Sequence, residues 1–327
     1  MTTNNTPLLF KRRDTINTVM VNVLIAALPA LCWSVYVFGF RSLSVCAASV
    51  LSAMVLHTVG DIFISRKIRF DLSCVVTGVL VGMAMPVSVP LWLPAAASAF
   101  AVIVGKIFFG GTGGNLFNPA ALGICFSYLT FGGYMTAFTK PFASLPAFYI
   151  EIPGEMLDSA RTVTSFENLR AGVVDPTCIS EELYGLVPGS IGTVSALMLF
   201  IGLVYLLLTR TVHFNSALAF LLVYTLLSLM LCYADYEPTQ FMELQLLSGN
   251  LMFVLTFMLN DYSTTPTTSL GRLIFAVLAA GAIFAARAFG MVDYCEFFVV
   301  LALNVLSPVI EKRTYPTVFG AYVRKTL

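Results

Sequence analysis

The sequence predicts an all-α protein that crosses a membrane about ten times. Of its 327 residues, 58% are hydrophobic and only 11% are charged, and the mean hydropathy is +0.88. Soluble domains carry about 45–50% apolar and about 25% charged residues, so this chain would leave large apolar surfaces uncovered in water. Its charges are also confined to short stretches between long uncharged runs. The expected partner of most of the surface is therefore the lipid bilayer.

The uncharged runs give the expected spans in chain order, since a membrane helix needs about 20 apolar residues. The runs of the first half are Thr15–Phe40, Ser42–Gly60, Leu72–Gly105 with two short spans, and Ile107–Thr139 with a span from about Asn118. The runs of the second half are Tyr184–Thr209, Thr211–Ala234, Leu244–Asn260, Leu270–Phe289 and Glu296–Ile310. Pro86, Pro90 and Pro94 separate the two short spans. Arg287 and Glu296 near span ends are expected to snorkel to the interface.

The distribution of basic residues predicts the orientation. Ten crossings put both termini on the same side, and thirteen Lys and Arg residues fall on that side against five on the other. The positive-inside rule then makes both termini cytoplasmic. The longest polar stretch, Gly133–Leu186, is expected to form an ordered external cap.

Two polar, proline-containing interruptions suggest an internal repeat. Gly82–Pro90 follows the third helix of the first half, and Phe257–Pro266 follows the third helix of the second half. Because each half has an odd number of helices, the second half would be inverted in the bilayer. The expected organisation is a first five-helix half at 1–132, an external loop at 133–186 and a second five-helix half at 187–327.

Charge and cysteine content exclude several other classes. Eighteen Lys and Arg against 17 Asp and Glu give no basic excess for nucleic acid. The seven cysteines are scattered singly, without CxxC or zinc-type spacing, so we predict no metal site within this chain. One alternative is a cluster ligated jointly with cysteines of another chain. No cleavable signal is expected, because the apolar run after Lys11-Arg12-Arg13 is too long.

A glycine-rich turn is the first candidate for chemistry. Gly110–Gly114 holds four glycines, which let the backbone approach a partner closely. Asn118-Pro119 then reads as an N-cap and a proline in the first helical turn. Such a site suits an anion or an electron-rich ring, and the alternative is a re-entrant turn that packs helices. The candidate contacts for a flavin or an ion here are Gly111, Gly113, Asn115 and Asn118.

Two further polar segments are candidates. Asn260–Ser269 lies between two apolar helices and requires a protein interior or a wet cavity. Within it, Asp261 faces an ion path or caps a helix, and the sequence leaves both open. Asp158–Gly172 in the external loop is a hydroxyl-rich turn entering a helix, which by composition alone is a structural feature.

Taken together, these features resemble one protein family. The sequence contains, in chain order, the glycine turn, the Val187–Thr193 segment and the Asp261–Thr268 break. These three motifs and their order resemble the RnfD/NqrB family of membrane subunits of ion-translocating respiratory oxidoreductases. The resemblance extends from Lys11 to Lys325, and the length is similar to that of RnfD, without the longer N-terminal extension of NqrB. It implies a fold of two inverted five-helix halves, similar to urea transporters, in a bacterial or archaeal cytoplasmic (inner) membrane.

The same resemblance implies a covalently attached FMN. Family members carry an external Ser-Gly-Ala-Thr-like motif whose threonine is esterified to the flavin phosphate. The matching residues are Arg161-Thr162-Val163-Thr164, which makes Thr164 the acceptor. Arg161 and Thr162 depart from the usual motif, so Thr162 and Ser165 stay second choices. A second, non-covalent flavin such as riboflavin is left open.

The function implied is electron transfer through flavin in a complex that couples ferredoxin and NAD redox chemistry to Na⁺ or H⁺ movement. The implied partners are flavin-bearing, iron–sulfur and NADH-binding subunits, with a flavin transferase for the modification. Two alternatives remain open from the residues: a stand-alone channel or transporter for a small solute, and an assembly subunit without flavin.

Overall fold

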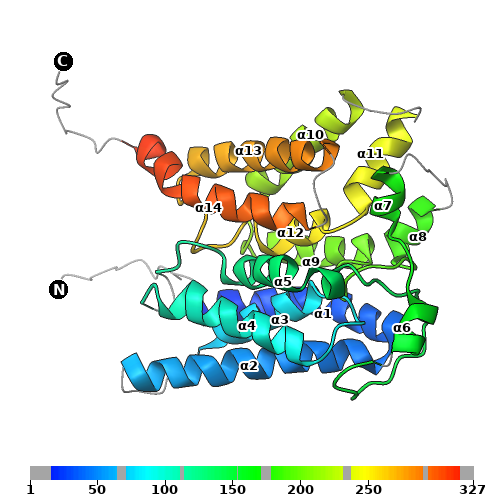
Figure 1. Cartoon of the computed structure of the whole chain (residues 1–327). Helices are drawn as coiled ribbons and strands as arrows, with labels where there is room; N and C mark the ends of the chain where they lie inside the picture. The colour runs from blue at the N-terminus through cyan, green and yellow to red at the C-terminus, as the bar shows by residue number, and fades with distance from the viewer. Residues whose placement is uncertain are drawn as a thin grey trace, which may run out of the picture.

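The computed structural model describes residues 16–64, 71–110, 114–152, 154–170, 178–230, 237–289 and 294–316. Within these ranges, helices form nearly all of the regular structure, as predicted (Figure 1). Three of them are long and apolar enough to cross a membrane by themselves: α1 (Ile16–Phe38), α2 (Phe40–Ile64) and α13 (Ser269–Ala288). With the shorter apolar helices described below, they confirm a polytopic helical membrane protein.

The first half contains the two short helices that its prolines predict. After α1 and α2 come α3 (Leu72–Met83), α4 (Trp92–Val102) with a π-helical extension at Ile103–Ile107, and α5 (Pro119–Met135). Helix α2 packs against α3 and α4, α1 packs against α3, and α4 packs against α5. Residues 84–90 between α3 and α4 are buried although they are not helical, so their backbone groups need partners inside the protein.

Arg41 supplies partners to this break. Its side chain is fully buried, and its guanidinium donates to the carbonyls of Val87, Val89 and Tyr149, with a distance of 2.8 Å to Val89. An arginine is suited to this task because its planar fork presents five donors. The buried, irregular backbone between α3 and α4 is thereby satisfied by protein groups rather than by water.

The second half repeats the packing order of the first. Its helices are α9 (Ala196–Leu208), α10 (Phe214–Met230), α11 (Pro238–Leu247), α12 (Leu251–Phe257), α13 and α14 (Cys295–Thr314). Helix α10 packs against α11 and α13, α9 against α12, and α13 against α14. The two halves meet where α1 packs on α9 and where α5 packs on α14. Figure 1 shows α1 and α9, and likewise α5 and α14, running in opposite directions.

Two expected spans differ from the structure. The Leu244–Asn260 run is not one helix, because Ser248–Asn250 separates α11 from α12 and Gly249 has a φ of +71°. The Tyr184–Thr209 run becomes α9 only at Ala196, whose N-cap is Ser195. Before it, Ile191 and Gly192 donate their N–H groups to the carbonyls of Met85 and Met83 at 2.9 and 2.6 Å. In the segment before α9 and in the break between α11 and α12, hydrogen-bond partners distant in sequence thus replace helical hydrogen bonds.

The loop between the halves forms a cap at one end of the helices. Three short helices lie there: α6 (Gly154–Ala160), α7 (Ser165–Arg170) and α8 (Cys178–Tyr184) (Figure 1). Backbone hydrogen bonds fix the described part of the loop, for example Lys140 N to Ala160 O at 2.9 Å and Leu91 N to Ile150 O at 2.8 Å. These bonds hold the described part of the loop against itself and against the break between α3 and α4.

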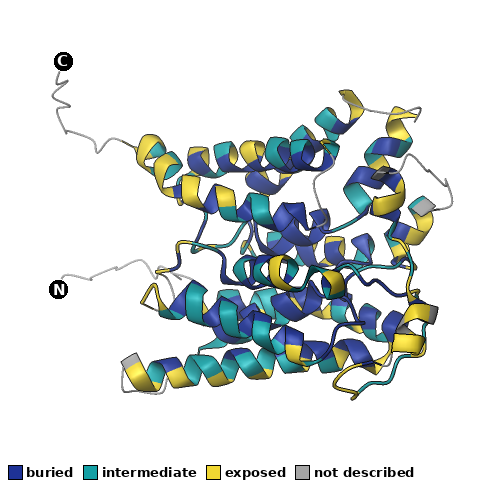
Figure 2. Cartoon of the chain, viewed as in Figure 1, coloured by how far each residue is buried: buried dark blue, intermediate teal, exposed yellow. Residues whose placement is uncertain are grey.

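The two interruptions lie at opposite ends of the molecule. The break between α3 and α4 contacts the cap through Arg41 and Ile150. The break between α12 and α13 contacts the end of α14, where the hydroxyls of Thr268 and Thr314 are 2.6 Å apart. Apolar side chains are exposed along the outer helices. Figure 2 shows exposed residues along α2, among which Leu51 is 62% exposed. A surface of this kind is suited to lipid.

Reporter fusions test the orientation. The charge distribution predicts that a reporter fused at Lys325 is cytoplasmic and one inserted near Glu155 in α6 is external. Alkaline phosphatase and green fluorescent protein fusions at both positions measure this. Activity of the same reporter at both positions would contradict the topology.

Candidate functional site

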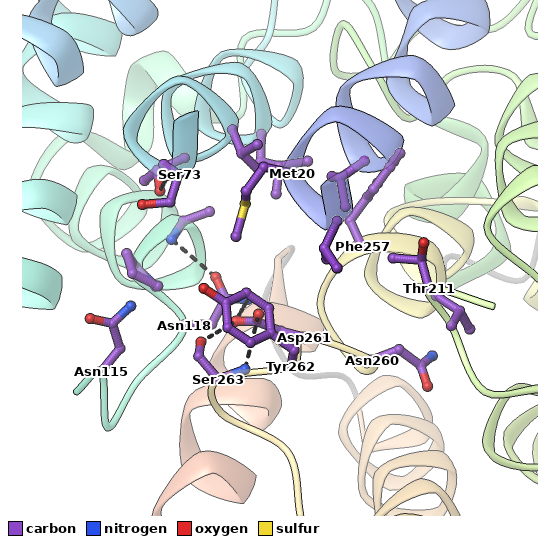
Figure 3. A pocket seen from close by; sticks show the side chains of 18 of the residues that line it. Met20, Ser73, Asn115, Asn118, Thr211, Phe257, Asn260, Asp261, Tyr262 and Ser263 are labelled. Carbon is purple, nitrogen blue, oxygen red and sulfur yellow. Dashed lines mark hydrogen bonds between the residues drawn. The ribbon is translucent and has the colours of Figure 1, made fainter. Parts of the chain in front are cut away.

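A polar cavity lies between the two halves at the end remote from the cap (Figure 3). We call it the Asp261 cavity. Its volume is about 70 Å³, which is room for a few water molecules or a small ion. Its polar side chains come from α3, the π-helical extension of α4, the turn before α5, α12, and the segments flanking α10 and α12. They are Ser73, Thr77, Lys106, Asn115, Asn118, Thr211, Thr256, Asn260, Asp261, Tyr262 and Ser263.

Asn118 links the two halves across this cavity. Its Oδ1 caps α5 as predicted, accepting hydrogen bonds from the N–H groups of Ala120 and Ala121 at 3.0 and 3.2 Å. Pro119 follows at the first helical position, where its missing N–H costs nothing. The cap leaves the Asn118 Nδ2 free to donate to Asp261 Oδ2 at 3.3 Å. One asparagine therefore both starts a helix and contacts the carboxylate of the other half.

Asp261 lies in a hydroxyl-rich turn. Its Oδ2 accepts from the hydroxyls of Ser263 and Thr264 at 3.1 and 3.3 Å, and its Oδ1 accepts from Ser263 N at 3.4 Å. The N-cap of the following helix α13 is Thr268, which accepts from Gly271 N at 3.1 Å. Asp261 is therefore not the cap of α13, and its carboxylate lines the cavity.

Lys106 is a member of the site that the sequence did not single out. It is only 2% exposed, and its Nζ donates to Ser73 Oγ at 2.9 Å. Asp71 and Asp261 are both close enough to attract its charge. A single lysine inside an otherwise apolar stretch that precedes a glycine turn was the available signal, because a buried charge needs a partner. The residues that pair with Lys106 are distant in sequence, so the neighbouring sequence does not identify them.

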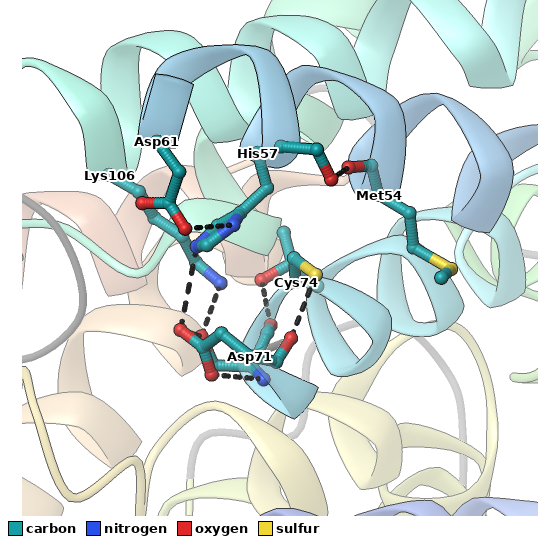
Figure 4. Close-up of polar contacts among 9 residues, drawn as sticks. Met54, His57, Asp61, Asp71, Cys74 and Lys106 are labelled. Carbon is teal, nitrogen blue, oxygen red and sulfur yellow. Dashed lines mark hydrogen bonds and ion pairs between the residues drawn. The ribbon is translucent and has the colours of Figure 1, made fainter. Parts of the chain in front are cut away.

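A row of titratable groups leads from α2 toward this lysine (Figure 4). Asp71 caps α3 and accepts from Ser73 N at 2.8 Å. His57 Nε2 lies 3.6 Å from Asp71 Oδ2, and His57 Nδ1 lies 3.8 Å from Asp61 Oδ2. Among the described residues, acid and base groups therefore alternate from Asp61 to the edge of the Asp261 cavity.

The glycine turn is described only in part. Asn115 is 8% exposed and lines the cavity with Asn118 and Asp261, so the structure brings these three predicted contacts together. Gly111 and Gly113 lie outside the described residues.

The hydroxyl-rich turn that contains Thr164 lies at the other end of the molecule. Thr164 is the N-cap of α7: its Oγ1 accepts from Glu167 N at 3.2 Å, and Thr164 N donates to Glu167 Oε2 at 3.5 Å. This reciprocal pair is a capping box. Thr164 and Thr162 are half-buried, and Thr162 N donates to Phe138 O at 3.0 Å. Ser165 is buried, so the two threonines are the more accessible hydroxyls.

A second cavity adjoins Thr164, and we call it the Thr164 cavity. Its volume is about 40 Å³. It lies between α7, α8, the segment before α9, the α11–α12 break and the start of α14. Its polar side chains are Thr164, Glu182, Ser190, Thr193, Asn250, Tyr294 and Glu296. Tyr294 donates to Met135 O at 3.0 Å and lies 3.1 Å from the Ser190 hydroxyl.

Glu296 lines this cavity and pairs with Arg287, and neither side chain snorkels, contrary to expectation. The two are 0% and 2% exposed at their side chains, and their closest N–O distance is 2.6 Å. Arg287 also donates to the carbonyls of Gln245 and Ser248 at 2.7 and 3.0 Å. The break after α11 creates these acceptors and holds the guanidinium inside the protein. Phe166 of α7 covers it, with the guanidinium carbon 4.6 Å from the ring centroid.

Comparison with known proteins gives consistent matches. The model of the NQR2, RnfD, RnfE family matches residues 2–320. The chain is 30% identical over 324 residues to a subunit of the Na⁺-translocating ferredoxin:NAD⁺ oxidoreductase complex of Acetobacterium woodii, covering 98% of this chain and 95% of that protein. It is 29% identical to a subunit of the ion-translocating oxidoreductase complex of Halorhodospira halophila, covering 93% and 91%. For a subunit of the Escherichia coli ion-translocating oxidoreductase complex, the identity is 28% and the coverage 97% of each chain.

Proposed function

The chain belongs to the NQR2, RnfD, RnfE family, and we propose that it is a membrane subunit of an electron-transport complex that couples ferredoxin and NAD redox chemistry to Na⁺ or H⁺ translocation. The observation that carries the ion role is the Asp261 cavity, because charged and amide side chains from both halves meet there among apolar helices. Ionisable groups inside a membrane bundle are costly and mark ion or proton pathways.

We propose that the electron carrier of this subunit is FMN esterified to Thr164. The residues present fit an attached phosphate, because the Thr164 hydroxyl is half-buried in a turn and its helix cap needs only its acceptor lone pair. Bound there, a flavin would supply one- or two-electron transfer. The chain itself supplies the acceptor hydroxyl and the fixed position of α7, which Phe166 holds against Arg287. Thr162 is the second choice, and Ser165 is the least accessible.

The Asp261 cavity is suited to an ion or to water. Its volume of about 70 Å³ gives room for a few water molecules or a small ion. The hydroxyl and carboxylate oxygens of Asp261, Ser263 and Thr264 are ligands of the type that hard cations prefer.

The fold proposal is ten membrane-spanning helices in two inverted five-helix halves, similar to urea transporters, with α11 and α12 counted as one span. The equivalent packing pairs, the opposite helix directions and the breaks at opposite ends support it. The proposed location is the cytoplasmic (inner) membrane, and the positive-inside rule supports both termini on the cytoplasmic side. The partners proposed are the flavin-bearing, iron–sulfur and NADH-binding subunits, and a flavin transferase that modifies Thr164.

Replacing Asp261 by Asn tests the ion role. The substitution keeps the shape and several of the hydrogen bonds but removes the charge from the cavity. We expect ion uptake into membrane vesicles to fall about tenfold or more while reduction of NAD⁺ by ferredoxin continues, since about 1.4 kcal/mol of lost cation binding corresponds to a factor of ten.

Glu311→Gln is the matched control. This carboxylate lies at the same end of the molecule, where it accepts a hydrogen bond from Thr267, and it does not line the cavity. Its loss should leave the ratio of ions moved to electrons transferred unchanged. An equal fall of both activities in Asp261→Asn, with the complex intact, would count against an ion role for this residue.

A further inference from the structure

The Thr164 cavity contains two buried carboxyl groups that the electron carrier does not require. Glu182 on α8 is 4% exposed, and Glu296 in the first turn of α14 is 2% exposed. Both line the cavity. Removing an ionised carboxylate from water costs several kcal/mol unless it is paired, so two such groups around one small cavity require a physical reason.

Glu296 is only half paired. Its Oε1 accepts two hydrogen bonds from Arg287, at 2.8 and 2.6 Å. Its Oε2 is buried and has no hydrogen-bond partner within the described ranges. The cavity beside it has room for a small number of water molecules. A buried acceptor of this kind normally binds water or another donor.

Glu182 differs from Glu296 because, in the part of the chain that the structure describes, no cation pairs with it directly. Burial raises the pKa of Glu182 to about 8, and this outweighs the opposing effects of a hydrogen bond from Ser165 and the more distant charge of Arg287. At neutral pH its carboxyl group therefore holds a proton, and it loses that proton in slightly alkaline solution. Glu182 belongs to the cap and not to a membrane-spanning helix.

The other charges around Glu182 are few. Glu181 precedes it on α8 and is exposed, as is Glu167 on α7, whereas Glu296 of α14 lines the cavity as part of a neutral pair with Arg287 of α13. Glu243 on α11 is exposed, and α9 carries no titratable group except Tyr205. The proton on Glu182 therefore responds mainly to burial and to the solvent that reaches the cavity edge, where Thr164, Pro188 and Gly189 are partly exposed.

We propose that the Thr164 cavity is a proton-binding site, in which the Glu182 carboxyl takes up and releases one proton through water held at the free oxygen of Glu296. The step converts Glu182–COOH and water to Glu182–COO⁻ and hydronium, with no change in electrons. The site itself stands on the residues of this chain. Its part in ion translocation, as a proton-exchange group on the cap side of the membrane, rests on the proposed function.

Infrared spectroscopy of the assembled complex tests the proposal directly. With ¹³C-labelled glutamate, the protonated carboxyl band of the native complex should disappear as the pH rises through about 8. Glu182→Gln should remove this transition, and Glu181→Gln, which alters the exposed neighbour on the same helix, should retain it. Glu182→Asp should keep a titrating carboxyl with a shifted midpoint if the Gln variant does not assemble.

Thermal stability gives a second readout that needs neither flavin nor turnover. Because the pKa of Glu182 in the folded chain is above its ordinary value of 4.5, its contribution to stability is complete below pH 4.5 and is lost as the pH rises to about 8. The Tm of the native complex should fall over that interval by several degrees more than the Tm of Glu182→Gln.

The possible results separate the two proposals. A transition near pH 8 that survives in Glu182→Gln would overturn the proton site, and so would a carboxyl band that responds to Na⁺ at constant pH and not to pH. Loss of the transition in Glu182→Gln supports the site even when ion uptake or flavin attachment fails. Failure of those activities in the native complex would count only against the proposed function.

Discussion

Replacing Thr164 by Ala is expected to abolish the flavin fluorescence of the denatured chain in an SDS gel. The variant lacks the only hydroxyl among the described residues that is partly exposed, adjoins the cavity and matches the threonine of the family motif. It also loses one half of the α7 capping box, worth about 1 kcal/mol, which a complex of this size should tolerate. Intact-mass measurement should find a chain lighter by one FMN than the native chain.

Three matched variants locate the attachment point. Thr164→Ser keeps both the hydroxyl and the helix cap and should restore labelling at least in part. Thr162→Ala and Ser165→Ala should retain the fluorescence, because they alter neighbours of the acceptor. Labelling that persists in Thr164→Ala and disappears in Thr162→Ala would mean that the motif is displaced by two residues. An unlabelled native chain would instead favour an assembly subunit without flavin.

Replacing Arg287 by Leu should destabilise the chain by about 3–5 kcal/mol, the usual effect of removing one partner from a buried ion pair. The substitution leaves the Glu296 carboxylate without its cation and the carbonyls of Gln245 and Ser248 without their donor. It also removes the contact that holds Phe166 of α7. We expect little assembled complex in membranes, measured by fluorescence-detected size-exclusion chromatography, and a lower Tm for whatever assembles.

The double variant Arg287→Leu/Glu296→Leu distinguishes loss of the pair from loss of one charge. Because no uncompensated charge remains, it should be more stable than Arg287→Leu alone. Arg313→Leu, at an exposed position near the end of α14, is the surface control and should assemble normally. Equal stability of Arg287→Leu and the native chain would show that the buried network does not support the fold.

Structural features that depend on a few neighbouring residues could be predicted from the sequence. Uncharged runs predicted the helical membrane class and the broken pair α3 and α4, because hydropathy and proline act locally. Asn118-Pro119 predicted the start of α5 because a cap and its N–H donors lie within three residues. The capping box at Thr164 is an equally local signal that was available in the Thr-x-x-Glu spacing.

Only the tertiary structure decided which polar groups meet. The contact of Asn118 with Asp261 spans 143 residues, and Lys106 reaches Ser73 across 33. The break after α11 contains no proline, and it persists because Arg287, 39 residues away from Ser248, donates hydrogen bonds to its freed carbonyls. The average hydropathy of Leu244–Asn260 predicts one span. The free energy of a break in that span depends instead on whether a donor distant in sequence can bond the freed carbonyls. The sequence therefore determined the helical membrane class, the break between α3 and α4 and the start of α5, and the folded packing of the two halves determined where the charges are stable.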